Sequence, residues 1–241
     1  MMDPDTDIGG ARTRFPETQL SAIRAAGAGS HERLIAAYWR PVYKYIRIKS
    51  RMPNEDAKDL TQAFFTRAIE KDFFQDYDAE KGTFRTYLRT CVDRFVANER
   101  QYAARHKRSG DLISLPVDFE AAESELRRAG EPASGSPEEY FDREWTRSLF
   151  ALALEALRRE YVQRGKEIQL HMFERYDLDE DRENLTYAEL AEEFGESAAD
   201  VTNHLAGARR AFRRIVLEKL REMTASEREF LSEARSLGIE V

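Results

Sequence analysis

Apolar side chains recur at intervals of three to four residues along most of this chain, and this spacing places them on one face of an α-helix. In segment 31–51, for example, Leu34, Tyr38, Val42 and Tyr45 share a face. The 241 residues include only 12 glycines and 7 prolines, so few positions interrupt such helices. We therefore predict an all-α protein, and a chain of this length typically forms two domains.

A stretch rich in glycine, proline and acidic residues divides the predicted helices into two groups. Such a composition is typical of a linker with little regular structure of its own. We predict, in chain order, a disordered N-terminal segment (1–17), a helical domain (18–108), an acidic linker (109–142), a second helical domain (143–224) and a tail with a short amphipathic helix (225–241).

The net charge of −7 is distributed unevenly along the chain. Residues 1–108 carry 20 Lys and Arg against 15 Asp and Glu, whereas the linker carries 2 against 9 and residues 143–241 carry 16 against 21. Basic residues also gather locally, with six bases and two acids in 89–108 and six bases and one acid in 209–221. Because phosphate binding requires cations, these two stretches indicate two localised contacts with a polyanion.

Residues 185–214 show the pattern of a helix-turn-helix unit. Thr186 and Glu189 have the spacing of a capping box at the start of one helix, Gly195 permits a turn, and Ser197 can cap the next helix. The outward face of that second helix presents side chains that can contact base edges and phosphates. These candidates are Thr202, Asn203, Arg209, Arg210 and Arg213.

Patterns of catalysis and metal binding are missing from the sequence. The four histidines lack ligand spacing, and Asp177, Asp179 and Asp181 lack the glycine and terminal glutamate of a calcium loop. Cys91 is the only cysteine, which excludes an intramolecular disulfide. No run of about 20 apolar residues and no signal peptide is found. We expect a cytoplasmic, non-enzymatic protein with no cofactor, metal or membrane segment.

Four motifs, in order along the chain, resemble those of the extracytoplasmic-function (ECF) sigma factors of bacterial RNA polymerase. They are Ala-Tyr-Trp-Arg-Pro-Val-Tyr-Lys-Tyr-Ile (37–46), Asn-Glu-Asp-Ala-Lys-Asp-Leu-Thr-Gln-Ala-Phe-Phe (54–65), Lys-Gly-Thr-Phe-Arg-Thr-Tyr-Leu (81–88) and Leu-Thr-Tyr-Ala-Glu-Leu-Ala (185–191). The resemblance covers nearly the whole chain. It implies an N-terminal helical bundle, called region 2, and a C-terminal helix-turn-helix domain, called region 4, joined here by an enlarged acidic linker.

The resemblance also implies a function and its residues. Family members bind core polymerase through its β′ clamp and β flap and direct promoter recognition and DNA melting. By this resemblance, the residues expected to contact the clamp are Asp56, Asp59 and Gln62, which match the family's clamp-contacting motif. Region 4 recognises the minus-thirty-five element, which adds His204 to the candidates above. Recognition of the minus-ten element as single-stranded DNA is implied for Lys81, Phe84, Arg85, Tyr87, Arg89, Arg94, Arg100, Arg105, Lys107 and Arg108.

The sequence departs from the family pattern at some of these positions. Thr202, His204 and Gly207 stand where the recognition helix is commonly basic, so phosphate contacts should be weaker or shift toward residues 209–214. Arg94 and Asn98 stand where the minus-ten helix often has Asn and Asp. The aromatic residues Phe84 and Tyr87 fit a position in the protein core as well as they fit a contact with DNA.

Two other functions therefore remain open. One is a sigma-like decoy that sequesters an anti-sigma factor, and the other is a helix-turn-helix repressor that acts without polymerase. An anti-sigma factor is also a candidate partner of a working sigma factor. The acidic linker is predicted to enter the cationic channel of the polymerase as a mimic of RNA. The sequence does not identify the promoter or the inducing signal.

Overall fold

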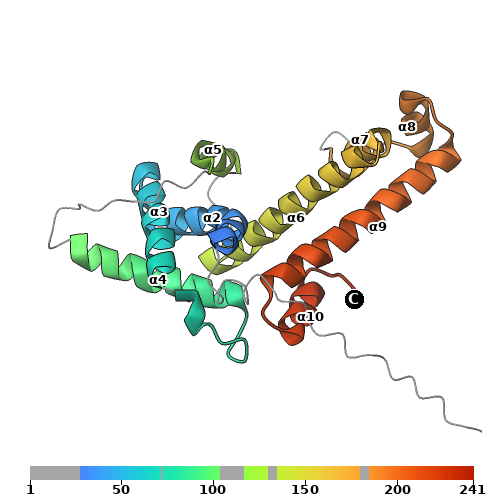
Figure 1. Ribbon diagram of the computed structural model, residues 1–241. Coiled ribbons are helices and arrows are strands. Elements are labelled where there is room, and N and C mark those ends of the chain that lie inside the picture. Colours follow the sequence, from blue (N-terminus) through green and yellow to red (C-terminus); the bar gives the residue numbers. More distant parts are fainter. Residues whose placement is uncertain (1–27, 72, 104–116, 130–134, 180–184) are drawn as a thin grey trace, which may run out of the picture.

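The computed structural model describes residues 28–71, 73–103, 117–129, 135–179 and 185–241. Every regular element in these ranges is helical, which confirms the predicted class (Figure 1). The elements are α2 (Ala28–Ser50), α3 (Asn54–Glu70), the 3-10 turn η1 (Phe73–Asp76), α4 (Phe84–Ala103), α5 (Phe119–Ala129), α6 (Pro137–Gln163), α7 (Glu167–Phe173), the π-helical turn η2 (Glu174–Leu178), α8 (Tyr187–Phe194), α9 (Ala198–Met223) and α10 (Glu227–Ser236).

Helix α6 connects the N-terminal helices to the C-terminal ones. Near its beginning, Phe141 packs edge-on against Tyr45 of α2, and Glu144 accepts a hydrogen bond from Lys44 of the same helix. Further along, Phe150 of α6 packs against α9, and the two long helices run side by side in Figure 1. A single unbroken helix therefore crosses residue 142, where the predicted linker ends.

Helix α2 lies at the centre of the N-terminal helices and is buried on several sides. Its predicted apolar stripe, which includes Tyr38 and Val42, is buried, but so are Tyr43 and Lys44 on other faces. The reason is that α3, α4, α5 and α6 all pack around it. A helix that is packed on most sides keeps only a small exposed surface, here at Ala36 and Lys49, and for this reason the buried Lys44 requires partners of its own.

Part of the predicted linker is folded, so the expectation of little regular structure is wrong for residues 117–129 and 135–142. Asp118 accepts a hydrogen bond from the Ala121 amide at the start of α5. Phe119 then packs edge-on against Trp39 and Tyr43 of α2, at centroid distances of 5.4 and 5.2 Å. This short amphipathic helix is difficult to recognise in the sequence, because it has only a few apolar side chains to bury and its acidic residues are frequent.

Two acidic side chains of α5 bind α2, one of them buried and the other partly exposed. Glu123 accepts a hydrogen bond from the Tyr43 hydroxyl at 2.7 Å. Glu125 lies 2.7 Å from Arg40 and 2.9 Å from Lys44. These carboxylates hold α5 on the helical bundle, so an RNA-mimicking role would require their release.

The bonds to Glu123 lead to an expected pH dependence of stability. Burial raises the pKa of this carboxyl, but hydrogen bonds from Tyr43 and Arg47 outweigh burial and leave the pKa below its ordinary value of 4.5. A carboxyl whose pKa is lower in the folded state than in the unfolded state stabilises the fold at pH values above the unfolded-state pKa. This stabilisation is lost as the pH falls through the folded-state pKa. At pH 7 we expect Glu123→Gln to lower the free energy of unfolding by about 1–3 kcal/mol.

Urea unfolding of both proteins checks this expectation. The difference in unfolding free energy should shrink as the pH falls below the unfolded-state pKa of about 4.3 and through the lower folded-state pKa, because the wild-type carboxyl is then protonated and resembles the amide. A difference of equal size at every pH would contradict the role of the charge.

The predicted caps around α8 and α9 are confirmed. Thr186 and Glu189 form a complete capping box, and Ser197 accepts a hydrogen bond from the Asp200 amide at 3.1 Å. Gly195 ends α8 in the left-handed conformation, with φ of 67°, which a glycine adopts without strain. A tight turn therefore joins α8 to the long helix α9. None of the helices in the described ranges combines the length and apolarity that a membrane span requires.

Candidate nucleic-acid and protein-binding surfaces

The outer side of α3 carries polar side chains that have no partner within the described part of the chain. Asp56 and Asp59 are exposed and Gln62 is half-buried, and no hydrogen bond or ion pair to their side chains is found among the described residues. The opposite side of the helix is fully buried, for example at Ala57 and Phe64. One face of α3 thus fixes the helix to the bundle, and the other face is available to a binding partner.

Two predicted DNA-binding arginines at the beginning of α4 already have partners in this structure. The Arg85 side chain is 17% exposed and that of Arg89 is 18% exposed. Arg85 Nη2 lies 2.9 Å from Glu233 Oε2 of α10, and Asp142 Oδ1 of α6 lies 3.6 Å from Arg85 Nη1 and 3.4 Å from Arg89 Nη1. These ion pairs hold both guanidinium groups inside the molecule.

Aromatic rings complete the surroundings of the same two arginines. The Arg85 guanidinium lies 4.7 Å from the ring centroid of Trp145, and that of Arg89 lies 5.9 Å from Phe141. Both rings belong to α6 and are buried. A carboxylate and an aromatic face are the groups that a guanidinium prefers, so α6 and α10 together cover the basic side of the first two turns of α4.

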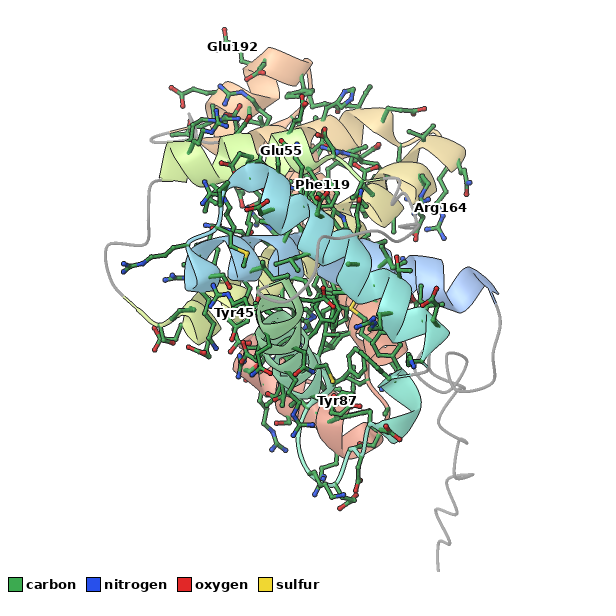
Figure 2. The ribbon with its side chains drawn as sticks, turned by 90° about the vertical axis from the view of Figure 1, so that its left-hand side faces the viewer. Tyr45, Glu55, Tyr87, Phe119, Arg164 and Glu192 are labelled. Carbon is green, nitrogen blue, oxygen red and sulfur yellow. The ribbon has the colours of Figure 1, made fainter. Side chains whose placement is uncertain are left out.

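Phe84 belongs to the core, which confirms one of the two interpretations that its position allowed. Its side chain is buried and packs against Tyr38 and Tyr77 at centroid distances of 5.5 and 5.2 Å. Tyr87, labelled in Figure 2, is half-buried and donates a hydrogen bond to the Phe73 carbonyl at 2.5 Å. Burial raises the pKa of the Tyr87 hydroxyl, so it remains a donor at neutral pH.

The other predicted minus-ten residues are exposed at the surface or lie outside the described ranges. Lys81 is strongly exposed and forms an ion pair with Asp78 at 3.1 Å. Arg94 is exposed, and the exposed Arg100 donates to the Ser50 carbonyl at 3.0 Å. Arg105, Lys107 and Arg108 lie outside the described residues.

The predicted minus-thirty-five residues lie between positions 202 and 213 of α9. Thr202 and Asn203 are exposed and His204 is half-buried. Arg209 binds Asp177 through two hydrogen bonds of 2.9 and 2.8 Å, and these bonds raise the pKa of the guanidinium further. The remaining two arginines are exposed: Arg210 lies beside Arg209, and Arg213 donates to the Glu240 carbonyl.

Sequence reasoning missed the acidic residues that bind the basic face of α4, namely Asp142, Glu229 and Glu233. Glu229 and Glu233 are buried, and burial raises the pKa of Glu233. One signal existed in the sequence, because residues four apart in a helix share a face, and these two acids flank Phe230 on the apolar side of the predicted tail helix. Which basic residues they bind cannot be derived from that spacing.

Comparisons with protein-family models, with curated proteins and with solved structures find no match. Among the described residues, no group of three or more His, Cys, Asp or Glu side chains has an arrangement that could hold a metal ion. Within the residues that the structure describes, the protein is all-helical, with an acidic face on α3 that has no partner there and a covered basic face on α4. The function must therefore be inferred from these two faces and from the sequence motifs.

Proposed function

We propose that this protein is a sigma factor of the ECF type, which binds core RNA polymerase and directs promoter recognition and DNA melting. The observation that carries the proposal is the outer face of α3. Asp56, Asp59 and Gln62, which match the family's polymerase-contacting motif, lie there without partners among the described residues, on a helix whose other face is buried.

The arrangement of the helices supports the assignment of two groups of helices to the two regions of a sigma factor. In this proposal α2, α3 and α4 form region 2, and the capped pair α8 and α9 forms the helix-turn-helix unit of region 4. The protein itself performs no catalysis. Melting follows from preferential binding of the opened strand, in which cationic and aromatic contacts offset the lost base stacking.

The experiment that tests the proposal measures binding to purified bacterial core RNA polymerase. Asp59→Ala/Gln62→Ala should lower the affinity at least about tenfold, because losing a charged hydrogen-bonding partner costs about 1.5–3 kcal/mol and 1.4 kcal/mol corresponds to tenfold. A matched control, Glu120→Ala/Gln101→Ala, removes an exposed carboxylate and an exposed amide elsewhere. The control should bind core polymerase as the wild type does.

Run-off transcription from genomic DNA fragments completes the test. Transcripts that require the added protein, and that disappear with the α3 variant but not with the control, support the sigma factor. Tight binding to core polymerase without transcripts would instead indicate the decoy. A wild-type protein that binds duplex DNA but not core polymerase would contradict the proposal and favour the repressor.

A further inference from the structure

The C-terminal helix α10 lies against the beginning of α4, as Figure 1 shows. Glu229 Oε1 accepts a hydrogen bond of 2.7 Å from the backbone N–H of Phe84, the first residue of α4. Glu233 pairs with Arg85 one residue later. Arg228 donates to the Ala79 carbonyl in the preceding loop at 2.7 Å. The tail therefore contacts the same short segment that the family resemblance assigns to single-stranded DNA.

The groups that α10 binds on α4 are ones that would otherwise bind a phosphate. The first N–H groups of a helix have no partner within the helix and attract anions. A guanidinium group binds carboxylates and phosphates with the same geometry. Glu229 occupies the helix N-terminus and Glu233 occupies the guanidinium, so two carboxylates stand where phosphate oxygens of bound DNA would lie.

Packing alone does not require acidic side chains at these positions. Both carboxylates are buried, and burial of a charge is costly unless a specific partner compensates it. The apolar part of α10 has its own contacts, since Phe230 is buried and the Arg221 guanidinium of α9 lies 4.2 Å from its ring centroid. Glu233 thus serves the contact with α4. Glu229 serves this contact and also the start of its own helix, because its Oε2 accepts a hydrogen bond of 2.8 Å from the Ala225 N–H.

The contact between α10 and α4 has the properties of a reversible one. Its described bonds are polar, and the outer ion pair of Arg228 with Glu80 has side chains that are both more than half exposed. Exposed ion pairs contribute little and are screened by salt. A competing polyanion can replace this outer pair easily, and at the two buried carboxylates it offers phosphate oxygens in exchange, so that α10 can leave α4 without unfolding the bundle.

We propose that α10 is an inhibitory segment that competes with the phosphates of single-stranded DNA for the first turn of α4. This inference rests on the proposed function, because α10 would regulate the part of the proposed region 2 that the family resemblance assigns to the minus-ten element. Binding of core polymerase and promoter DNA displaces α10 and opens Nη2 of Arg85 to the DNA backbone, while Nη1 stays beside Asp142.

The first experiment measures the affinity for a fluorescein-labelled single-stranded DNA of randomised sequence. Glu229→Gln/Glu233→Gln replaces both acids by amides of equal size. Since Glu229 accepts from the N–H groups of both Phe84 and Ala225, the amide at position 229 points its own NH₂ group at one of these two donors. The control Glu227→Gln/Glu240→Gln makes the same change of charge at two exposed positions nearby. If α10 is released from α4 in about a tenth of the wild-type molecules, the first variant should bind the single-stranded DNA about tenfold more tightly than the control does.

Adding Arg85→Ala to the first variant should remove that gain. Hydrogen exchange of the Phe84 amide reports separately whether α10 has been released. A released helix with no gain in affinity over the control would overturn the inference. A gain that Arg85→Ala leaves intact would overturn it as well.

The second experiment uses the wild-type protein, so it does not depend on the variants folding. Hydrogen exchange in segment 227–236 should accelerate when the protein is bound to core polymerase and single-stranded DNA. Unchanged protection in that complex would overturn the inference. The proposed function fails differently, through loss of the core binding that depends on Asp59 and Gln62, which the α10 variants leave in place.

Discussion

Replacing Lys44 by methionine is expected to lower the free energy of unfolding by about 2–3 kcal/mol, because the buried carboxylate of Glu144 then keeps only Arg147, a mostly exposed partner, as its cation. The Lys44 side chain is 2% exposed and its ammonium lies 2.7 Å from Glu144, which is buried as well. Glu125, the second partner at 2.9 Å, is partly exposed and can turn toward water. The loss of unfolding free energy therefore comes mainly from the weakened compensation of the Glu144 charge.

The matched control is Lys49→Met on the same helix. The Lys49 side chain is 36% exposed and pairs with Asp93 and Glu138 at the surface, so its loss should cost about 1 kcal/mol or less. Urea unfolding at pH 7 measures both variants. Lys44→Met/Glu144→Leu should lose less than the sum of its two single variants, because it removes both charges together. Equal losses for Lys44→Met and Lys49→Met would contradict the buried pair.

The second large effect is expected at Phe84. Phe84→Ala should lower the free energy of unfolding by about 3–5 kcal/mol, because it leaves a cavity among Tyr38, Phe74 and Tyr77. The family resemblance implies a DNA contact at the same position, and an exposed stacking residue would lose little stability on truncation.

Thermal and urea unfolding of Phe84→Ala distinguish these two roles before any DNA is added. Phe150→Ala is the control, since Phe150 is partly exposed on α6 and should cost about 1 kcal/mol. Stability equal to that of the wild type would show that Phe84 does not belong to the core. A large loss means that weakened DNA binding by this variant reports a disturbed α4 and not a lost stacking contact.

Local features of this protein could be predicted from its sequence because their causes are local. The caps at Thr186 and Ser197 involve residues three apart, and the apolar stripe of α2 follows from helical spacing. The burial of Lys44 could not be predicted in this way, because it depends on α5 and α6 closing over α2.

The same limit applies to the candidate sites. The exposed face of α3 was predictable, since a helix with one apolar face exposes the other. The covering of Arg85 was not, because its partners Asp142 and Glu233 lie far away in the sequence and on two other helices. Basic residues identify a surface that can bind an anion, but only the packing of the whole chain shows which anion occupies it.

The unbroken helix α6 has a geometric consequence for promoter recognition by a protein of this kind. Its 27 residues span about 40 Å at the usual rise per residue. One end is fixed to α2 by the Lys44–Glu144 pair and the other lies beside α9, so the helix sets the separation between the two proposed DNA-binding units. A rigid separation in the protein selects for a fixed number of base pairs between the two promoter elements.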